Sequence, residues 1–147
     1  MNIVQGHNLV LMINNIDHIA IAVSNMNESL HFWRDILGLE IIHSEEIRSQ
    51  RVNTVFFQIG NSKIELIEAI DEDNGIARFL SRGGSAIHHI ALEVENISEM
   101  LSHLNSHGVK VINDAPVKGA DNKLAVFVHP DSTSGVLLEF YESQIVN

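Results

Sequence analysis

The sequence predicts an α+β fold built from two copies of one βαβββ module. The run IDHIAIAV at residues 16–23 recurs as IHHIALEV at residues 87–94. The two halves also end with similar runs, IELIE at residues 64–68 and LEFYE at residues 138–142. Each half therefore begins with a strand that carries a histidine and ends with a strand that carries a glutamate.

The elements of the first module, predicted at about residues 15–70, follow from its periodicity. Residues 16–23 alternate between an apolar face and a face of small residues that includes His18, which is typical of a strand. Apolar residues recur at helical spacing over residues 25–37, and Gly38 follows as a helix stop. Three further strands are predicted, at residues 39–43, 52–59 and 63–68.

The second module, predicted at about residues 86–142, repeats this order. We expect a first strand at residues 87–94 and a helix at residues 97–107. Three more strands are predicted near residues 109–112, 125–129 and 136–141. A linker with a short helix, residues 71–85, joins the modules into one domain over residues 15–147, and residues 1–14 are predicted to be an N-terminal extension.

Composition narrows the possible functions. A net charge of −10 argues against nonspecific nucleic-acid binding, which needs clustered basic residues. No apolar stretch approaches the ~20 residues that span a bilayer, and there is no signal-peptide pattern. With no cysteine, metal ligands must be nitrogen or oxygen atoms. We therefore expect a cytoplasmic protein without nucleic-acid or membrane partners, whose candidate anion-binding residues are Arg48, Arg51, Lys118 and Lys123.

Four polar residues on apolar strands form the candidate site. His18 and His89 occupy the same position in the two modules, and Glu65 and Glu139 interrupt the apolar closing strands. Imidazole and carboxylate groups together bind divalent metals, so we predict one shared ion held by all four. The alternative is a hydrogen-bonded polar core. Because neighbouring residues on a strand face opposite ways, His88 is expected on the helix-packed face of the sheet.

Five runs stand out along the chain: IDHIAIAV at 16–23, KIEL at 63–66, HHIA at 88–91, HP at 129–130 and GVLLE at 135–139. Together they resemble methylmalonyl-CoA epimerases, members of the vicinal oxygen chelate superfamily that also contains glyoxalase I. The resemblance covers about residues 15–142. It implies a cupped mixed sheet of two βαβββ modules around one metal, which could be cobalt, manganese, nickel or zinc, with His18, Glu65, His89 and Glu139 as its ligands.

The same resemblance implies an activity. Such a protein would interconvert the 2R and 2S forms of methylmalonyl-CoA by removing the α-proton through a metal-stabilised enolate. Inversion needs an acid/base on each face of the substrate, and we expect Glu65 and Glu139 to serve as this pair. An acyl-CoA is the implied small-molecule partner, and a homodimer is expected, as is common among the relatives.

The sequence departs from the family at three positions. Thr54 stands where some members carry a glutamate base, Arg51 replaces a glycine, and Asp131 replaces a lysine. If the second base is neither Glu65 nor Glu139, Glu45 and Glu46 are the next candidates. Two other functions stay open, a glyoxalase I-like lyase or isomerase and a metal-free binding module of the same fold.

Overall fold

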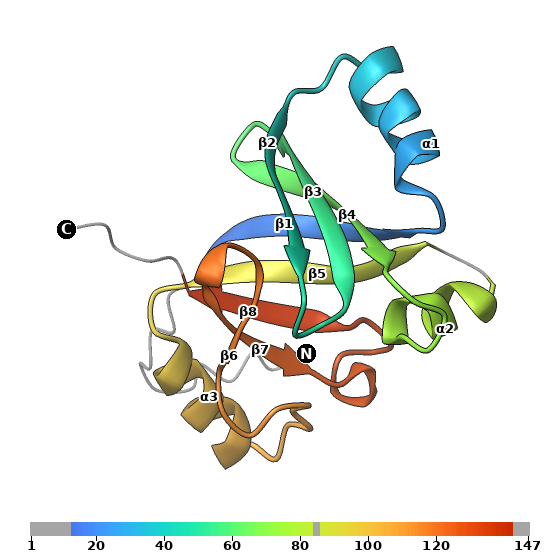
Figure 1. The fold of residues 1–147 in the computed structure, drawn as a ribbon. Coiled ribbons are helices and arrows are strands. Elements are labelled where there is room, and N and C mark those ends of the chain that lie inside the picture. The colour runs from blue at the N-terminus through green and yellow to red at the C-terminus, as the bar shows by residue number, and fades with distance from the viewer. Residues whose placement is uncertain (1–12, 84–85, 143–147) are drawn as a thin grey trace.

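The computed structural model describes residues 13–83 and 86–142, which form one curled sheet of eight strands in the order β2-β3-β4-β1-β5-β8-β7-β6 (Figure 1). The strands are β1 (Ile13–Val23), β2 (Ile41–Ile47), β3 (Val52–Ile59), β4 (Ser62–Ala69), β5 (Ile87–Val94), β6 (Val117–Lys118), β7 (Leu124–Val128) and β8 (Leu138–Glu142). The helices are α1 (Met26–Leu30), the π-helical η1 (His31–Ile36), α2 (Gly75–Ser81), α3 (Ile97–Ser106) and the 3-10 turns η2 (Ala120–Asn122) and η3 (Pro130–Ser132). The predicted α+β fold is confirmed, whereas most of the proposed extension, residues 1–12, lies outside the described residues.

The two modules meet along β1 and β5, the histidine strands, which pair antiparallel at the middle of the sheet. On either side, β4 runs parallel to β1 and β8 runs parallel to β5. Figure 1 shows β2, β3 and β4 in one half of the molecule and β5, β7 and β8 in the other. The glutamate strands therefore flank the histidine strands, one on each side.

Each module covers the outer face of its half of the sheet with its own helix. The α1–η1 segment lies on Val55, Phe57 and Leu66, and the ring of Trp33 stacks on Phe57 with centroids 6.4 Å apart. Helix α3 packs its buried residues against Val126 and other apolar residues of β5, β7 and β8. The helices lie at opposite ends of the molecule in Figure 1. Burial of these apolar faces supplies most of the driving force for the fold.

The last glutamate of each module caps the module's own helix. Glu68 accepts a hydrogen bond from the backbone N–H of Met26 at 2.6 Å, and Glu142 accepts one from Ile97 at 2.8 Å. An anionic acceptor at a helix start satisfies a free N–H and interacts favourably with the helix dipole. Glu68 and Glu142 therefore have equivalent structural roles in the two modules.

Helix α2 lies on the opposite, inner face of the sheet. Asn74 caps it by accepting from the N–H of Ile76, and Ile76 is buried with Ala22, Val52 and Ile67. This helix was predicted as a short linker helix, and it closes one end of the inner face. The inner face is therefore the one on which a site can be enclosed.

The strand predicted near residues 109–112 is reduced to a single bridge between Val111 and Val128. Two backbone hydrogen bonds support the bridge, from Ile112 to Phe127 and from His129 to Lys110. The outer strand of the second module is instead the short β6. The side chain of Asn113 accepts from the N–H of Phe127 at 2.8 Å. Because this side chain occupies a donor that a continuous outer strand would use, pairing along this edge is interrupted.

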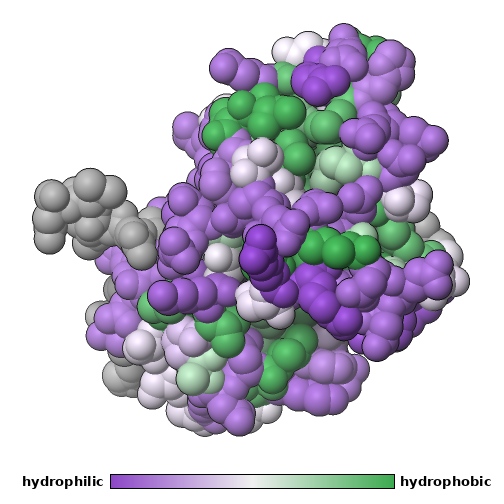
Figure 2. All heavy atoms as spheres, viewed as in Figure 1, coloured by the Kyte–Doolittle hydropathy of each residue, from purple (hydrophilic) through white to green (hydrophobic). Residues whose placement is uncertain are grey.

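Among the described residues no helix is long and apolar enough to cross a membrane. Polar side chains dominate the face seen in Figure 2, with apolar groups gathered most clearly over the half that holds β2 and β3. Seven large apolar residues of this module are exposed: Ile16, Phe32, Ile36, Leu37, Ile42, Ile59 and Ile70.

Candidate metal centre

The structure brings all four sequence-predicted ligands together on the inner face. Nε2 of His18 lies 3.1 Å from Nε2 of His89, 3.1 Å from Oε2 of Glu65 and 3.3 Å from Oε2 of Glu139. Nε2 of His89 lies 3.5 Å and 2.8 Å from the same two carboxylate oxygens. All four residues are at most 5 % exposed. Both imidazoles therefore direct the same nitrogen at one buried point, beside both carboxylates.

Two alanines create the space for this cluster. Across the sheet, Ala20 on β1 has Glu65 and His89 as its neighbours on β4 and β5. Ala91 on β5 has the other two cluster residues as its neighbours on β1 and β8. Neither alanine is exposed. Because facing residues on paired strands lie side by side, larger side chains here would fill the volume that the imidazoles and carboxylates occupy.

The outer strands add a matching pair of aromatic walls. Phe56 faces Glu65 across β3 and β4, and its ring meets His18 edge-on with centroids 5.5 Å apart. In the other module Phe127 faces the second glutamate, and its ring meets His89 edge-on at 5.9 Å. Each imidazole is thus held in orientation by a phenylalanine of its own module.

A β-bulge precedes each histidine. The pairing of β1 with β5 skips a residue between Ile16 and His18, which leaves Asp17 without a partner across the sheet. It shifts again where Ala20 and Ile21 face His89 and Ile87, which leaves His88 unmatched. An extra residue breaks the alternation of side chains locally and re-aims one of them. The two bulges lie at equivalent positions of the repeat.

Each bulged residue lies beside Nδ1 of the histidine that follows it. Oδ2 of Asp17 is 2.7 Å from Nδ1 of His18, and Nζ of Lys63 lies 3.1 Å from the other Asp17 oxygen. In the second module Nδ1 of His88 is 2.9 Å from Nδ1 of His89. With Nδ1 engaged in this way, Nε2 of each histidine is directed to the centre.

The prediction for His88 needs correction. Its ring does contact a helix, lying edge-on to Phe79 of α2 with centroids 4.9 Å apart. That helix covers the inner face, however, not the outer face on which strict alternation would place His88. The bulge is the physical reason, because alternation holds only where the two strands pair residue for residue.

The electrostatics of the cluster favour a cation. Burial opposes ionisation of Glu139 most strongly, but hydrogen bonds with His18 and His89 outweigh it and lower its pKa to about 2. Burial also disfavours a charged His18, yet Asp17, Glu139 and Glu65 together raise its pKa well above the usual value. The carboxylates thus favour positive charge on His18, and positive charge beside Glu139 favours its ionised form.

The cluster fits a divalent metal. Ligand atoms about 2.0–2.2 Å from one ion, at tetrahedral or octahedral angles, lie roughly 2.8–3.6 Å from one another. The five distances given above, from 2.8 to 3.5 Å, fall in that range. A cavity of about 20 Å³ adjoins the four side chains, enough for one water or ion. Three of the four, His18, His89 and Glu139, each offer one ligand atom within 4.8 Å of the other two.

Comparison with known proteins identifies the family. The model of the glyoxalase/bleomycin resistance protein/dioxygenase superfamily matches residues 17–127. The chain belongs to this superfamily. It is 40 % identical over 129 residues to the uncharacterized protein YqjC of Bacillus subtilis, covering 88 % of this chain and 92 % of YqjC. The mitochondrial methylmalonyl-CoA epimerase of Dictyostelium discoideum is 36 % identical over 131 residues, which cover 88 % of this chain and 79 % of that enzyme.

A solved structure from the same superfamily has a similar fold. A Streptomyces coelicolor methylmalonyl-CoA epimerase variant, in complex with 2-nitronate-propionyl-CoA, superposes with a TM-score of 0.86. It is 30 % identical in sequence, and the match covers 92 % of this chain and 99 % of that one. The curled sheet of this protein is therefore the fold of the superfamily.

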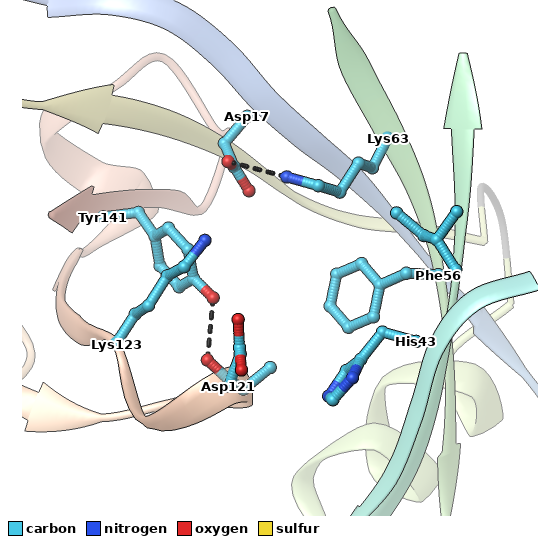
Figure 3. Close-up of a pocket in the computed structure, with 9 residues that line it drawn as sticks. Asp17, His43, Phe56, Lys63, Asp121, Lys123 and Tyr141 are labelled. Atoms are coloured by element: carbon cyan, nitrogen blue, oxygen red, sulfur yellow. Dashed lines mark hydrogen bonds and ion pairs between the residues drawn. The ribbon is translucent and has the colours of Figure 1, made fainter. Parts of the chain in front are cut away.

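A chamber of about 190 Å³ is lined by Asp17 and by polar and aromatic residues of both modules. Figure 3 shows Lys63 and Lys123 reaching into it from opposite sides, with His43 and Phe56 facing Tyr141. Burial, followed by nearby carboxylates, raises the pKa of Tyr141, and its hydroxyl donates to the carbonyl of Ala120 at 2.8 Å. The chamber thus offers two ammonium groups in a protein of net charge −10.

The remaining candidate residues are either part of the sheet near the centre or paired on the surface. Thr54 is buried, and its hydroxyl donates to the carbonyl of Glu45. A threonine cannot serve as the base that some relatives carry at this position. Glu45 accepts from the N–H of Asp121 at 2.8 Å, linking β2 to the loop before β7. The others form surface ion pairs: Arg48 with Glu46, Arg51 with Asp71, and Asp131 with Lys110.

Sequence reasoning missed the residues that orient the centre. Asp17 precedes His18 and is itself buried, and Phe56 and Phe127 recur at the same offset as the two histidines. That offset was the available signal, because a residue repeated together with a ligand is a candidate to support it. Lys63, which pairs with Asp17, has no comparable signal.

Proposed function

We propose that this protein is a metal-dependent epimerase that interconverts the 2R and 2S forms of methylmalonyl-CoA. The observation that carries the proposal is the buried cluster of two imidazoles and two carboxylates, each pair supplied symmetrically by the two modules. Relatives named as methylmalonyl-CoA epimerases support the choice of substrate. Membership of the superfamily alone would leave the reaction open.

The ligands of the proposed ion are His18, Glu65, His89 and Glu139, and cobalt, manganese, nickel or zinc all suit this donor set. When bound, the ion supplies Lewis-acid stabilisation of the negative charge that develops on the thioester oxygen as the α-proton leaves. The side chains of the centre contribute ligand atoms fixed in place by β-strands. Such rigid support favours precise placement of a substrate.

Glu65 and Glu139 are the proposed acid/base pair. They belong to β4 and β8, which flank the histidine strands on opposite sides. In each glutamate, Oε2 lies next to a histidine Nε2. Oε1 is then the carboxylate oxygen proposed to exchange the proton. Oε1 of Glu139 faces Gly119, where an added Cβ would lie 3.7 Å away. One carboxylate would take the α-proton from one face of the substrate, and the other would return a proton to the opposite face.

Substrate access requires movement of two segments that cover the centre. The end of β2 and the turn after it contribute Ile47 and Gln50 to the lining of the 20 Å³ cavity, and the loop before β7 contributes Gly119 and Ala120. An acyl-CoA thioester is far larger than this space. Both segments must therefore separate before the substrate reaches the ligands, a motion common in enzymes that exclude water during reaction.

Lys123 is the better placed of the two chamber lysines to attract the substrate carboxylate. Lys63 is paired with Asp17, whereas the ammonium group of Lys123 lies 5.0 Å above the Tyr141 ring. A cation over an aromatic face keeps its charge available to an incoming anion. This local charge offsets the long-range repulsion expected from a protein of net charge −10.

A homodimer is part of the proposal. The exposed apolar residues of the first module, defined above, provide a surface that a second copy would cover. Sedimentation over a range of concentrations should give a mass near twice 16.4 kDa. A mass of one chain at every concentration would contradict this part.

Deuterium exchange tests the whole proposal. Metal-stripped protein is incubated with methylmalonyl-CoA in heavy water, with and without added cobalt, manganese, nickel or zinc. We expect the α-proton to exchange and both epimers to form only when metal is present. Isomerisation of the methylglyoxal–glutathione hemithioacetal without this exchange would favour the glyoxalase I-like function. Ligand binding with neither metal nor turnover would favour a binding module.

A further inference from the structure

Beyond the four proposed ligands, the two bulges single out one residue whose part in the centre the sequence did not suggest. His88 and Asp17 stand at equivalent positions of the repeat, each unmatched across the β1–β5 pairing and each directly before a ligand histidine. Bulges beside active sites are typically features that aim a side chain. The same irregularity at two related points indicates a shared task.

The hydrogen-bond geometry defines that task. Oδ2 of Asp17 is 2.7 Å from Nδ1 of His18, and Nδ1 of His88 is 2.9 Å from Nδ1 of His89. A histidine that binds metal through Nε2 carries its proton on Nδ1 and donates it to a nearby acceptor. Nδ1 of His88 is that acceptor if the His88 ring carries its own proton on Nε2.

We propose that His88 is a positioning residue, which accepts the Nδ1–H of His89 and so fixes the tautomer and ring orientation in which His89 binds the metal. It acts for His89 as Asp17 acts for His18, but with a neutral acceptor in place of a carboxylate. The His88 ring also packs edge-on against Phe79 of α2, a contact that buries the ring without supplying a polar atom. The inference rests on the proposed metal centre and does not depend on the substrate.

Zinc affinity separates this role from simple packing. His88→Leu removes the acceptor but keeps apolar bulk, and we expect zinc to bind about 10–100-fold more weakly. His88→Asn places an amide oxygen near the position of Nδ1 and should restore the affinity to within about threefold of the original. Phe79→Leu, the packing control, should also stay within about threefold.

A spectroscopic measurement on the unsubstituted protein gives an independent test. With ¹⁵N-labelled histidine and zinc bound, nuclear magnetic resonance should show His89 protonated on Nδ1 and His88 protonated on Nε2. In His88→Leu the His89 ring should lose the hydrogen-bonded Nδ1–H signal. This measurement keeps the inference testable even if a variant folds poorly.

The outcomes separate the two levels of inference. Unchanged zinc affinity in His88→Leu, or equal losses in His88→Leu and His88→Asn, would overturn the positioning role while leaving the centre intact. A wild-type His88 protonated on Nδ1 would also overturn it. Failure of the unsubstituted protein to bind zinc or cobalt would remove the centre itself, and the positioning role with it.

Discussion

The two halves of the centre share a geometry but differ in chemistry. In the first half, His18 is backed by the carboxylate of Asp17, which pairs with Lys63. In the second half, His89 is backed by the imidazole of His88, which lies against Phe79. Strand pairing, bulge and histidine position are the same in both. Both halves of the repeat therefore place the histidine in the same way, while the group behind each histidine differs.

The two cavities beside these groups also differ. The chamber of about 190 Å³ is lined from both modules and includes the charged residues Asp17, Lys63 and Lys123. A larger cavity of about 730 Å³ has His88 and His89 in its lining, together with apolar residues such as Phe79 and Val136. Asp17 therefore borders a chamber with several charged groups, whereas His88 borders a more apolar cavity.

Removing one histidine from each half is the strongest test of their equivalence. His18→Ala and His89→Ala should each abolish metal binding and lower kcat at least about a thousandfold, since a catalytic metal contributes several kcal/mol to transition-state stabilisation. Bound metal is measured by elemental analysis and turnover by epimer formation. His31→Ala, at a side chain 72 % exposed, is the control and should match the unsubstituted protein. Retention of metal by one variant would show that the halves are not equivalent.

Replacing one glutamate of each half should produce a one-sided enzyme. Glu65→Gln and Glu139→Gln each keep an oxygen ligand but lose the proton acceptor. Each variant should therefore keep metal and still exchange the α-proton of one epimer in heavy water, while epimerisation falls about 10²–10⁴-fold. Full epimerisation by Glu65→Gln would place the second base elsewhere, with Glu45, Glu46 or a bound water as the next candidates.

Filling the space between the ligands should affect both halves alike. Ala20→Val and Ala91→Val each add two methyl groups where neither side chain is exposed, which should cost about 1–3 kcal/mol in the free energy of unfolding and also weaken metal binding. Urea denaturation and zinc titration measure the two effects. Ala22→Val, in the cluster under α2, is the matched control that should lose stability but bind zinc normally. Normal zinc binding by Ala20→Val would argue against a tightly fitted cluster.

The helix caps provide the smallest test of symmetry. Glu68→Ala and Glu142→Ala each remove an acceptor from the first turn of a helix and should lower the free energy of unfolding by about 1 kcal/mol. The loss at Glu68 should be slightly larger, because its other oxygen accepts from Asn53. Urea denaturation measures both, and Glu46→Ala on the surface should change stability by less than about 0.5 kcal/mol. No change in either variant would remove the capping role.

Much of the fold was predictable because the repeat and the local periodicity agree. The strands at 52–59 and 87–94 have the predicted bounds, and both main helices begin within one residue of the predicted start. The apolar pattern alone could not show that the strand expected near 109–112 would be reduced to a bridge. There the side chain of Asn113 takes a donor of Phe127, a contact between residues 14 apart that periodicity does not contain.

The sequence by itself determined which residues could meet, since His18, His89, Glu65 and Glu139 are marked by position in the repeat and by strand face. Only the tertiary structure decided how they meet. The bulges at Asp17 and His88 arise from the register between β1 and β5, strands separated by more than sixty residues. Strand alternation is a local property of the chain, whereas register depends on both partners at once. For that reason the sequence could indicate which four residues converge, whereas the positions of Asp17 and His88 beside the imidazoles followed only from the register.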